Sequence, residues 1–215
     1  MSNTITIDMD SKAIKHLARN DKRLAKVISI IGPISYKLSS DPYLFLVDTI
    51  MGQMLSNKVA EVLSARLKTL CSNDVNPSTI NSLTDEEIRS LGVSSAKVKY
   101  IRSLTNEFTL GTIDFHTLSQ LKDQEIIKQL TSIKGIGTWS AKMYLIFVLD
   151  RPNVLPFEDG AFQSAYSWLY KTSDTSPQVV KAKCKKWEPY TSIAARYLYQ
   201  ALDHGLTKEP FHLYK

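Results

Sequence analysis

Nearly the whole of this 215-residue chain has the apolar spacing of short helices, and that spacing limits its fold more than any other feature. In residues 56–70 the apolar positions fall on one helical face: Val59, Val62, Leu63, Leu67 and Leu70. Similar segments follow at short intervals, without a repeat of fixed period or a low-complexity stretch. The pattern predicts an all-α fold of about ten short helices joined by short loops.

Local signals place the ends of several helices. One helix is expected to start near Asp21 and to stop at Gly32. Asp41 is a plausible N-cap, with Pro42 at the first helical position. The segment "TDEEI" has the spacing of a capping box. Strand-like alternation is confined to residues 4–8, which is too short to change the expected class.

Composition excludes several classes of protein. The chain has no run of about 18 apolar residues to span a membrane, and its first residues lack the basic-then-apolar layout of a secretory signal. Cys71 and Cys184 form no CxxC pair and cannot supply four ligands to an iron–sulfur cluster, which favours a reducing, cytoplasmic setting. The four histidines show no metal-ligand spacing. A net charge of +6 favours a polyanionic partner.

The segment "LTSIKGIGTWSA" interrupts a helical stretch with two glycines one residue apart. Gly135 and Gly137 allow positive φ and close approach of the backbone, while Ile136 between them can enter the local core. A second helix is expected to begin near Thr138, so its first amides would face outward and attract phosphate. Lys134 adds a positive charge there. From the glycines alone, a plain helix–helix turn is the more common explanation.

The longer string "LTSIKGIGTWSAKMYLIFVL" resembles the helix-hairpin-helix element of DNA glycosylases, in the branch typified by 3-methyladenine DNA glycosylase II. Four further segments are similar to that branch and occur in the same order: "LVDTIMGQMLSNKVAEVLSARL", "LGVSSAKVKYIRSL", "RPNVLPFEDGAF" and "WEPYTSIAARYLY". Five ordered matches are far more specific than the hairpin alone.

The resemblance implies a helix-hairpin-helix DNA glycosylase fold with two helical lobes and a cleft between them. We expect one lobe over residues 42–150, ending with the hairpin. The other lobe would combine residues 1–41 with residues 151–215 and would carry the catalytic aspartate.

The catalytic aspartate of the related enzymes corresponds here to Asp159, directly after "LPFE". Breaking an N-glycosidic bond builds positive oxocarbenium character on the deoxyribose, and a fixed carboxylate can stabilise that charge and orient water. Asp159 also precedes the helical segment "GAFQSAYSWLY", so a role as helix N-cap is the alternative, and the two roles are compatible. The neighbouring Glu158 is expected to be a solvated or supporting acid.

Lyase-type relatives carry a lysine nucleophile two residues after the last hairpin glycine, where this chain has Trp139. The resemblance therefore implies a monofunctional glycosylase that uses water, although Lys134 and Lys142 lie nearby in the sequence. Trp139 would give a flat wall for a flipped base, and its ring face would favour a cationic base. A partly buried core tryptophan is the alternative.

Met54 corresponds to the family residue that fills the space left by the flipped nucleotide, normally the second glutamine of a "QQ" pair. Methionine can wedge between bases, but it has no amide for the orphaned partner base. Gln53 is expected to make a structural bond to the backbone, and Ser56 to cap the next helix or to touch the minor groove. The remaining predicted DNA contacts lie in the hairpin: Lys134, Gly135, Gly137 and Ser140.

The resemblance also implies a monovalent cation, Na⁺ or K⁺, held by the backbone carbonyls of Thr131, Ile133 and Gly135. No other cofactor is expected to be required.

The sequence thus predicts a monomeric enzyme that hydrolyses the N-glycosidic bond of alkylated purines in duplex DNA, of the 3-methyladenine or 7-methylguanine type. It would initiate base excision repair in the bacterial cytoplasm, or in the nucleus of a eukaryote. Such purines are positively charged and leave readily, so little general-acid help is needed. Two alternatives are a glycosylase of the same fold for other damaged or mismatched bases, and a non-catalytic helix-hairpin-helix module that only binds DNA.

Overall fold

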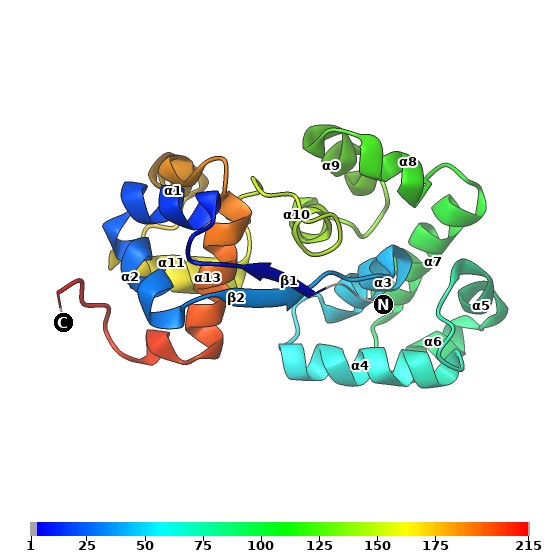
Figure 1. Ribbon diagram of the computed structural model, residues 1–215. Helices are drawn as coiled ribbons and strands as arrows, with labels where there is room; N and C mark the ends of the chain where they lie inside the picture. Colours follow the sequence, from blue (N-terminus) through cyan, green and yellow to red (C-terminus); the bar gives the residue numbers. More distant parts are fainter. Residues whose placement is uncertain (1–3, 215) are drawn as a thin grey trace. The chain divides into compact units, whose positions relative to one another are not determined.

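The computed structural model describes residues 4–214, which form helices α1 to α13 and one two-stranded sheet (Figure 1). The chain divides into two compact units, the first comprising Met1–Leu38 with Asp150–Lys215 and the second Ser39–Leu149. The unit boundaries therefore fall at 39 and 150, where the sequence suggested 42 and 151. Within the described residues, no helix is long and apolar enough to cross a membrane.

The second unit is entirely helical in the part of the chain described. Its helices are α3 (Pro42–Gly52), α4 (Asn57–Leu70), α5 (Pro77–Ser82), α6 (Asp85–Ser90), α7 (Ser95–Thr109), α8 (Phe115–Gln120), α9 (Asp123–Thr131) and α10 (Thr138–Phe147). Helix α3 is central, since it packs against α4, α7 and α10. It buries Leu46, Val47, Ile50 and Met51 completely, which accounts for the apolar character of its sequence.

The first unit combines the two ends of the chain. Its elements are β1 (Thr4–Ile7), α1 (Lys12–Asn20), α2 (Lys22–Ile31), β2 (Ile34–Lys37), α11 (Gly160–Tyr170), α12 (Pro177–Cys184), α13 (Thr191–Asp203) and two short 3-10 helices, η1 (Lys185–Trp187) and η2 (Leu206–Lys208). Helix α13 packs against α2 and α11. Strand β1 lies in residues 4–8, the only strand candidate in the sequence, whereas its antiparallel partner β2 was not foreseen.

Side-chain caps fix the helix starts as the sequence indicated. The carboxylate of Asp21 accepts from the amides of Arg23 and Leu24 at the start of α2, and Asp41 accepts from Leu44 at the start of α3. The capping box that opens α6 is also present. Each cap satisfies amides that the first helical turn would otherwise leave unpaired.

Asp21 also accepts hydrogen bonds from three other side chains of the first unit. Its carboxylate accepts from the Tyr170 hydroxyl, from Trp187 Nε1 at 2.9 Å and from Lys186 Nζ at 2.9 Å. Burial alone would raise the pKa of Asp21, but the hydrogen bonds from Tyr170, Lys186 and Trp187 outweigh it and lower that pKa. The carboxylate is therefore stabilised in its charged form although only 3% of the residue is exposed.

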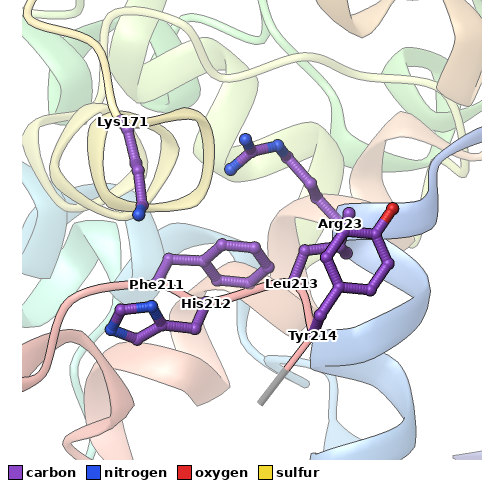
Figure 2. Close-up of a pocket in the computed structure, with 6 residues that line it drawn as sticks. All are labelled: Arg23, Lys171, Phe211, His212, Leu213 and Tyr214. Atoms are coloured by element: carbon purple, nitrogen blue, oxygen red, sulfur yellow. The ribbon is translucent and has the colours of Figure 1, made fainter.

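A surface pocket of about 360 Å³ lies where the C-terminal segment passes α2 and the end of α11 (Figure 2). Its walls are Arg23, Lys171 and residues 211–214. The Arg23 guanidinium donates to the carbonyl of Leu169 at 2.7 Å and lies over the Phe211 ring, so it serves to hold the C-terminal segment in place. None of the predicted site residues lines this pocket.

Candidate functional site

The hairpin predicted from the two glycines is present between α9 and α10. Ile133 and Ile136 are buried, and the Ile136 amide donates to the Ile133 carbonyl at 3.0 Å, which closes the turn. Helix α10 begins at Thr138, as predicted, with Gly137 at its N-cap. Lys134 is exposed beside the turn. The hairpin therefore presents the start of a helix without a capping side chain, which is a suitable site for an anion.

The two hairpin glycines differ in what they do. Gly135 has φ +99°, and a Cβ there would lie 2.3 Å from Cγ of Tyr100 on α7. Gly137 has φ −95°, and a Cβ there would meet no atom of residues 4–214 within 4 Å. Of the two glycines that allow positive φ, only Gly135 adopts it. Of these two hairpin positions, the fold requires glycine at 135, where the turn packs against the Tyr100 ring.

The turn after α3 is tied directly to the hairpin. Gln53 Nε2 donates to the carbonyl of Gly135 at 2.8 Å, which confirms the structural role predicted for this side chain. Lys97 of α7 donates from Nζ to the carbonyls of Met51 and Gln53, each at 2.8 Å, and burial lowers the pKa of Lys97. The matching block "LGVSSAKVKYIRSL" contained Lys97 and Tyr100, but nothing in it indicated which residue each would contact.

Met54 lies at the tip of this turn. Its backbone is left-handed (φ +59°), and the side chain is fully exposed, with a relative exposure of 102%. A residue other than glycine, asparagine or aspartate is seldom found in that region, and strain of this kind is concentrated at functional sites. Gln53 and Lys97 anchor the backbone of this turn. The exposed Met54 side chain therefore projects into solvent from a fixed backbone position beside the hairpin.

The other residues predicted on this face vary in accessibility. Ser56 is exposed and occupies the N-cap position of α4, but its side chain makes no cap hydrogen bond. Trp139 is half-buried in the first turn of α10. Ser140 is only 1% exposed, so its hydroxyl is not on the surface. This fraction refers to the whole residue, so the Ser140 amide is buried as well.

Two of the three carbonyls named for a cation already accept hydrogen bonds. The Ile133 carbonyl accepts from Ile136, and the Gly135 carbonyl accepts from Gln53. Since a carbonyl oxygen has two lone pairs, each keeps one for a further partner. These oxygens are compatible with a monovalent ion. Among residues 4–214 there is no cluster of three or more His, Cys, Asp or Glu side chains suited to a metal.

Asp159 belongs to the first unit, where it is the N-cap of α11. Its Oδ1 accepts from the Phe162 amide at 2.8 Å, and its own amide donates to the Pro156 carbonyl at 3.0 Å. Gln163 Nε2 donates to the carbonyl of Phe157 at 2.8 Å. The loop before α11 is thus held at three points, and the carboxylate of Asp159 is half-buried in a fixed place, with Glu158 half-buried beside it.

A tyrosine of α13 faces Asp159. Burial, together with the charge and hydrogen bonding of Asp159, raises the pKa of Tyr199 above its usual range. Tyr199 is in the matching block "WEPYTSIAARYLY", but nothing in that block indicated that it would face the carboxylate. Its hydroxyl is shielded from solvent.

Comparison with known proteins places these features in a family context. A family model described as "HhH-GPD superfamily base excision DNA repair protein" matches residues 47–189. DNA-3-methyladenine glycosylase 1 of Schizosaccharomyces pombe is 29% identical over 197 residues, which cover 88% of this chain and 86% of that protein.

Two solved structures are also similar to this chain over most of its length. DNA-3-methyladenine glycosidase from Bacillus halodurans is 31% identical, with a TM-score of 0.84 and 96% of each chain covered. The S. pombe 3-methyladenine DNA glycosylase in complex with abasic DNA is 27% identical, with a TM-score of 0.83, 90% of this chain covered and 97% of that one.

Proposed function

The chain belongs to the HhH-GPD superfamily of base excision DNA repair proteins, and we propose that it is a DNA-3-methyladenine glycosylase without lyase activity. The predicted family and helical fold class are confirmed by these matches. The observation that carries the proposed activity is the Asp159 carboxylate, which follows "LPFE" and is fixed at the start of α11 by its bond to Phe162. The named relatives are glycosylases of 3-methyladenine.

The proposed reaction needs one charged group. The bond between C1′ of the deoxyribose and the purine nitrogen breaks, and its electron pair remains on the base, which neutralises the positive charge of an alkylated purine. The Asp159 carboxylate stabilises the oxocarbenium character that develops on the sugar. Water then adds to C1′ and gives up a proton to the carboxylate or to solvent. A cationic leaving group departs readily, so no general acid is required.

Substrate choice is assigned to Trp139. An alkylated purine carries positive charge, and the face of an indole ring attracts a cation. Trp139 is half-buried in the first turn of α10, and in the proposed complex its ring would form a wall for the extrahelical base.

The absence of lyase activity is assigned to the same residue. Trp139 cannot form an imine with the abasic sugar, and Lys142 of α10 is only 9% exposed. We expect borohydride added during turnover to trap no protein–DNA adduct, and strands to break only after alkali. An adduct that disappears in Lys134→Ala or Lys142→Ala would refute the monofunctional assignment.

A monovalent cation is part of the proposal. The carbonyls of Thr131, Ile133 and Gly135 would hold Na⁺ or K⁺, and the ion would order the turn that binds phosphate. DNA affinity would then be higher in K⁺ or Na⁺ than in tetramethylammonium at equal ionic strength. Equal DNA affinity in all three salts would refute the proposed ion site.

The activity is tested with duplex oligonucleotides that each contain one defined lesion. We expect release of 3-methyladenine and 7-methylguanine type bases, followed by alkali-labile strand breaks at the lesion. The proposed substrate is duplex DNA in the compartment that holds the genome, and the proposed active form is a monomer. Release of only neutral or mismatched bases would favour the alternative glycosylase, and binding without any base release would favour the non-catalytic module.

A further inference from the structure

Helix α12 and the following 3-10 helix carry a group of lysines, three of which lie over aromatic rings. Lys181 Nζ is 4.4 Å from the centre of the Phe157 ring, whereas Lys183 and Lys186 lie over Tyr170 at 5.0 Å and 5.2 Å. All three distances are within the range of cation–π attraction. Lys186 is also paired with Asp21, which neutralises its charge. Lys181 and Lys183 are exposed and differ mainly in which ring they lie against.

The ring beneath Lys181 belongs to the loop that carries Asp159. Phe157 is two residues before Asp159, and its carbonyl is held by Gln163 from the first turn of α11. The Asp159 amide closes the same loop onto Pro156. The Lys181 ammonium therefore lies against a ring two residues before Asp159, in a loop that is held at both points.

The ring beneath Lys183 lies at the other end of α11 from Asp159. Tyr170 is the last residue of α11, an 11-residue helix that starts directly after Asp159. With a rise of 1.5 Å per residue, the two ends of this helix are about 15 Å apart. Lys183 is therefore a matched control for Lys181, since it has the same charge, the same helix and the same kind of contact.

We propose that Lys181 binds a backbone phosphate of the nucleotide whose sugar lies at Asp159. This inference rests on the proposed function. The two phosphates of a nucleotide are attached to the sugar that Asp159 must approach, so at least one of them lies beside the Phe157 loop. An exposed ammonium there pairs with the phosphate, and the Phe157 ring orders the lysine before DNA arrives. Lys181 is a binding residue for the extrahelical nucleotide, separate from the hairpin.

The test is binding of the full chain to two labelled duplexes, one undamaged and one with a single tetrahydrofuran abasic analogue. The variants are Lys181→Gln, Lys183→Gln and Lys181→Arg, measured by fluorescence anisotropy over a series of salt concentrations. We expect Lys181→Gln to weaken binding to the abasic duplex by about three- to tenfold, and to reduce the salt slope by about 0.9. Lys181→Arg should restore both values, because arginine keeps the charge and also stacks on rings.

The comparison between variants decides the result. Lys183→Gln should weaken binding to the abasic duplex less than Lys181→Gln does, and Lys181→Gln should weaken binding to the undamaged duplex less than to the abasic one. Equal losses in the two lysine variants, equal losses on the two duplexes, or no loss in Lys181→Gln would each overturn the inference. Base release measured with the unmodified protein separates this outcome from the proposed function. If bases are released while Lys181→Gln binds normally, only the inference fails; if none is released, the proposed function fails.

Discussion

Gly135 and Gly137 have different roles, and the structure gives the expected loss of stability when each is substituted. In Gly135→Ala the new methyl group would lie 2.3 Å and 2.4 Å from Cγ and Cβ of Tyr100. Because Cβ cannot move away by side-chain rotation, the backbone has to shift, which costs about 1–3 kcal/mol. The left-handed backbone at this position adds about 1–2 kcal/mol. Gly135→Ala should therefore lower the free energy of unfolding by about 2–5 kcal/mol.

Gly137→Ala should behave differently. Within the described part of the chain the new methyl group meets no atom closer than 4 Å, and the backbone at φ −95° suits any residue. Alanine is a poorer N-cap than glycine, so the cost should stay below about 1 kcal/mol. The methyl group would, however, lie where phosphate approaches the first amides of α10. We expect normal stability with weaker binding to damaged and undamaged duplexes alike, and a shallower salt dependence.

Urea unfolding followed by circular dichroism, together with fluorescence anisotropy on both duplexes, separates the two effects. Gly137→Ser is a useful companion, since serine is a good N-cap and keeps the fold while placing a side chain in the same space. A Gly137→Ala protein that binds DNA as well as the unmodified protein would refute the phosphate site. Unchanged stability in Gly135→Ala would refute the packing argument.

Two other substitutions test separate parts of the account. Met54→Ala should reduce the single-turnover rate on lesion duplexes more than it reduces affinity for undamaged DNA, because the wedge acts only once a base has left the stack. Equal reductions in the rate and in the affinity would indicate a general contact with DNA. Asp21→Asn should remove stability at neutral pH, because the lowered pKa of Asp21 means that its charged form favours the folded state. That contribution is fully present above the unfolded-state pKa, near 4, and is lost as pH falls through the lower folded-state value. Unfolding free energies measured from pH 7 down to pH 2 should therefore converge for the two proteins, and a constant difference would contradict the linkage.

The features of the fold that could be predicted from the sequence are those set by residues close together along the chain. The caps at Asp21 and Asp41 bind amides two or three positions away, so residue type and spacing are enough to place them. Strand β2 was missed because its four residues are ordered by pairing with β1, which is distant in sequence. Short strands of this kind have little local signal.

The same division holds within the candidate site. Gln53 was correctly assigned to a backbone bond, and Asp159 lies at the predicted helix start. The sequence could not show that, of the two hairpin glycines, Gly135 is the one with no room for a Cβ, since this depends on Tyr100, which comes from another helix. Nor could it show that Ser140 points inward, because a helix position near a turn can face either way until its neighbours are known.

The most direct test of the central claim is the rate of 7-methylguanine release by Asp159→Asn, measured under single-turnover conditions with enzyme in excess. Asparagine is as good an N-cap as aspartate, so the bond to Phe162 and the start of α11 should be preserved. The account predicts a fall in rate of at least about 100-fold, because the charge that stabilises the sugar is lost. It also predicts DNA affinity that is unchanged or tighter, because a negative charge near phosphate is removed. A rate close to that of the unmodified protein, with the variant folded and bound to DNA, would contradict the assignment of Asp159 as the catalytic group.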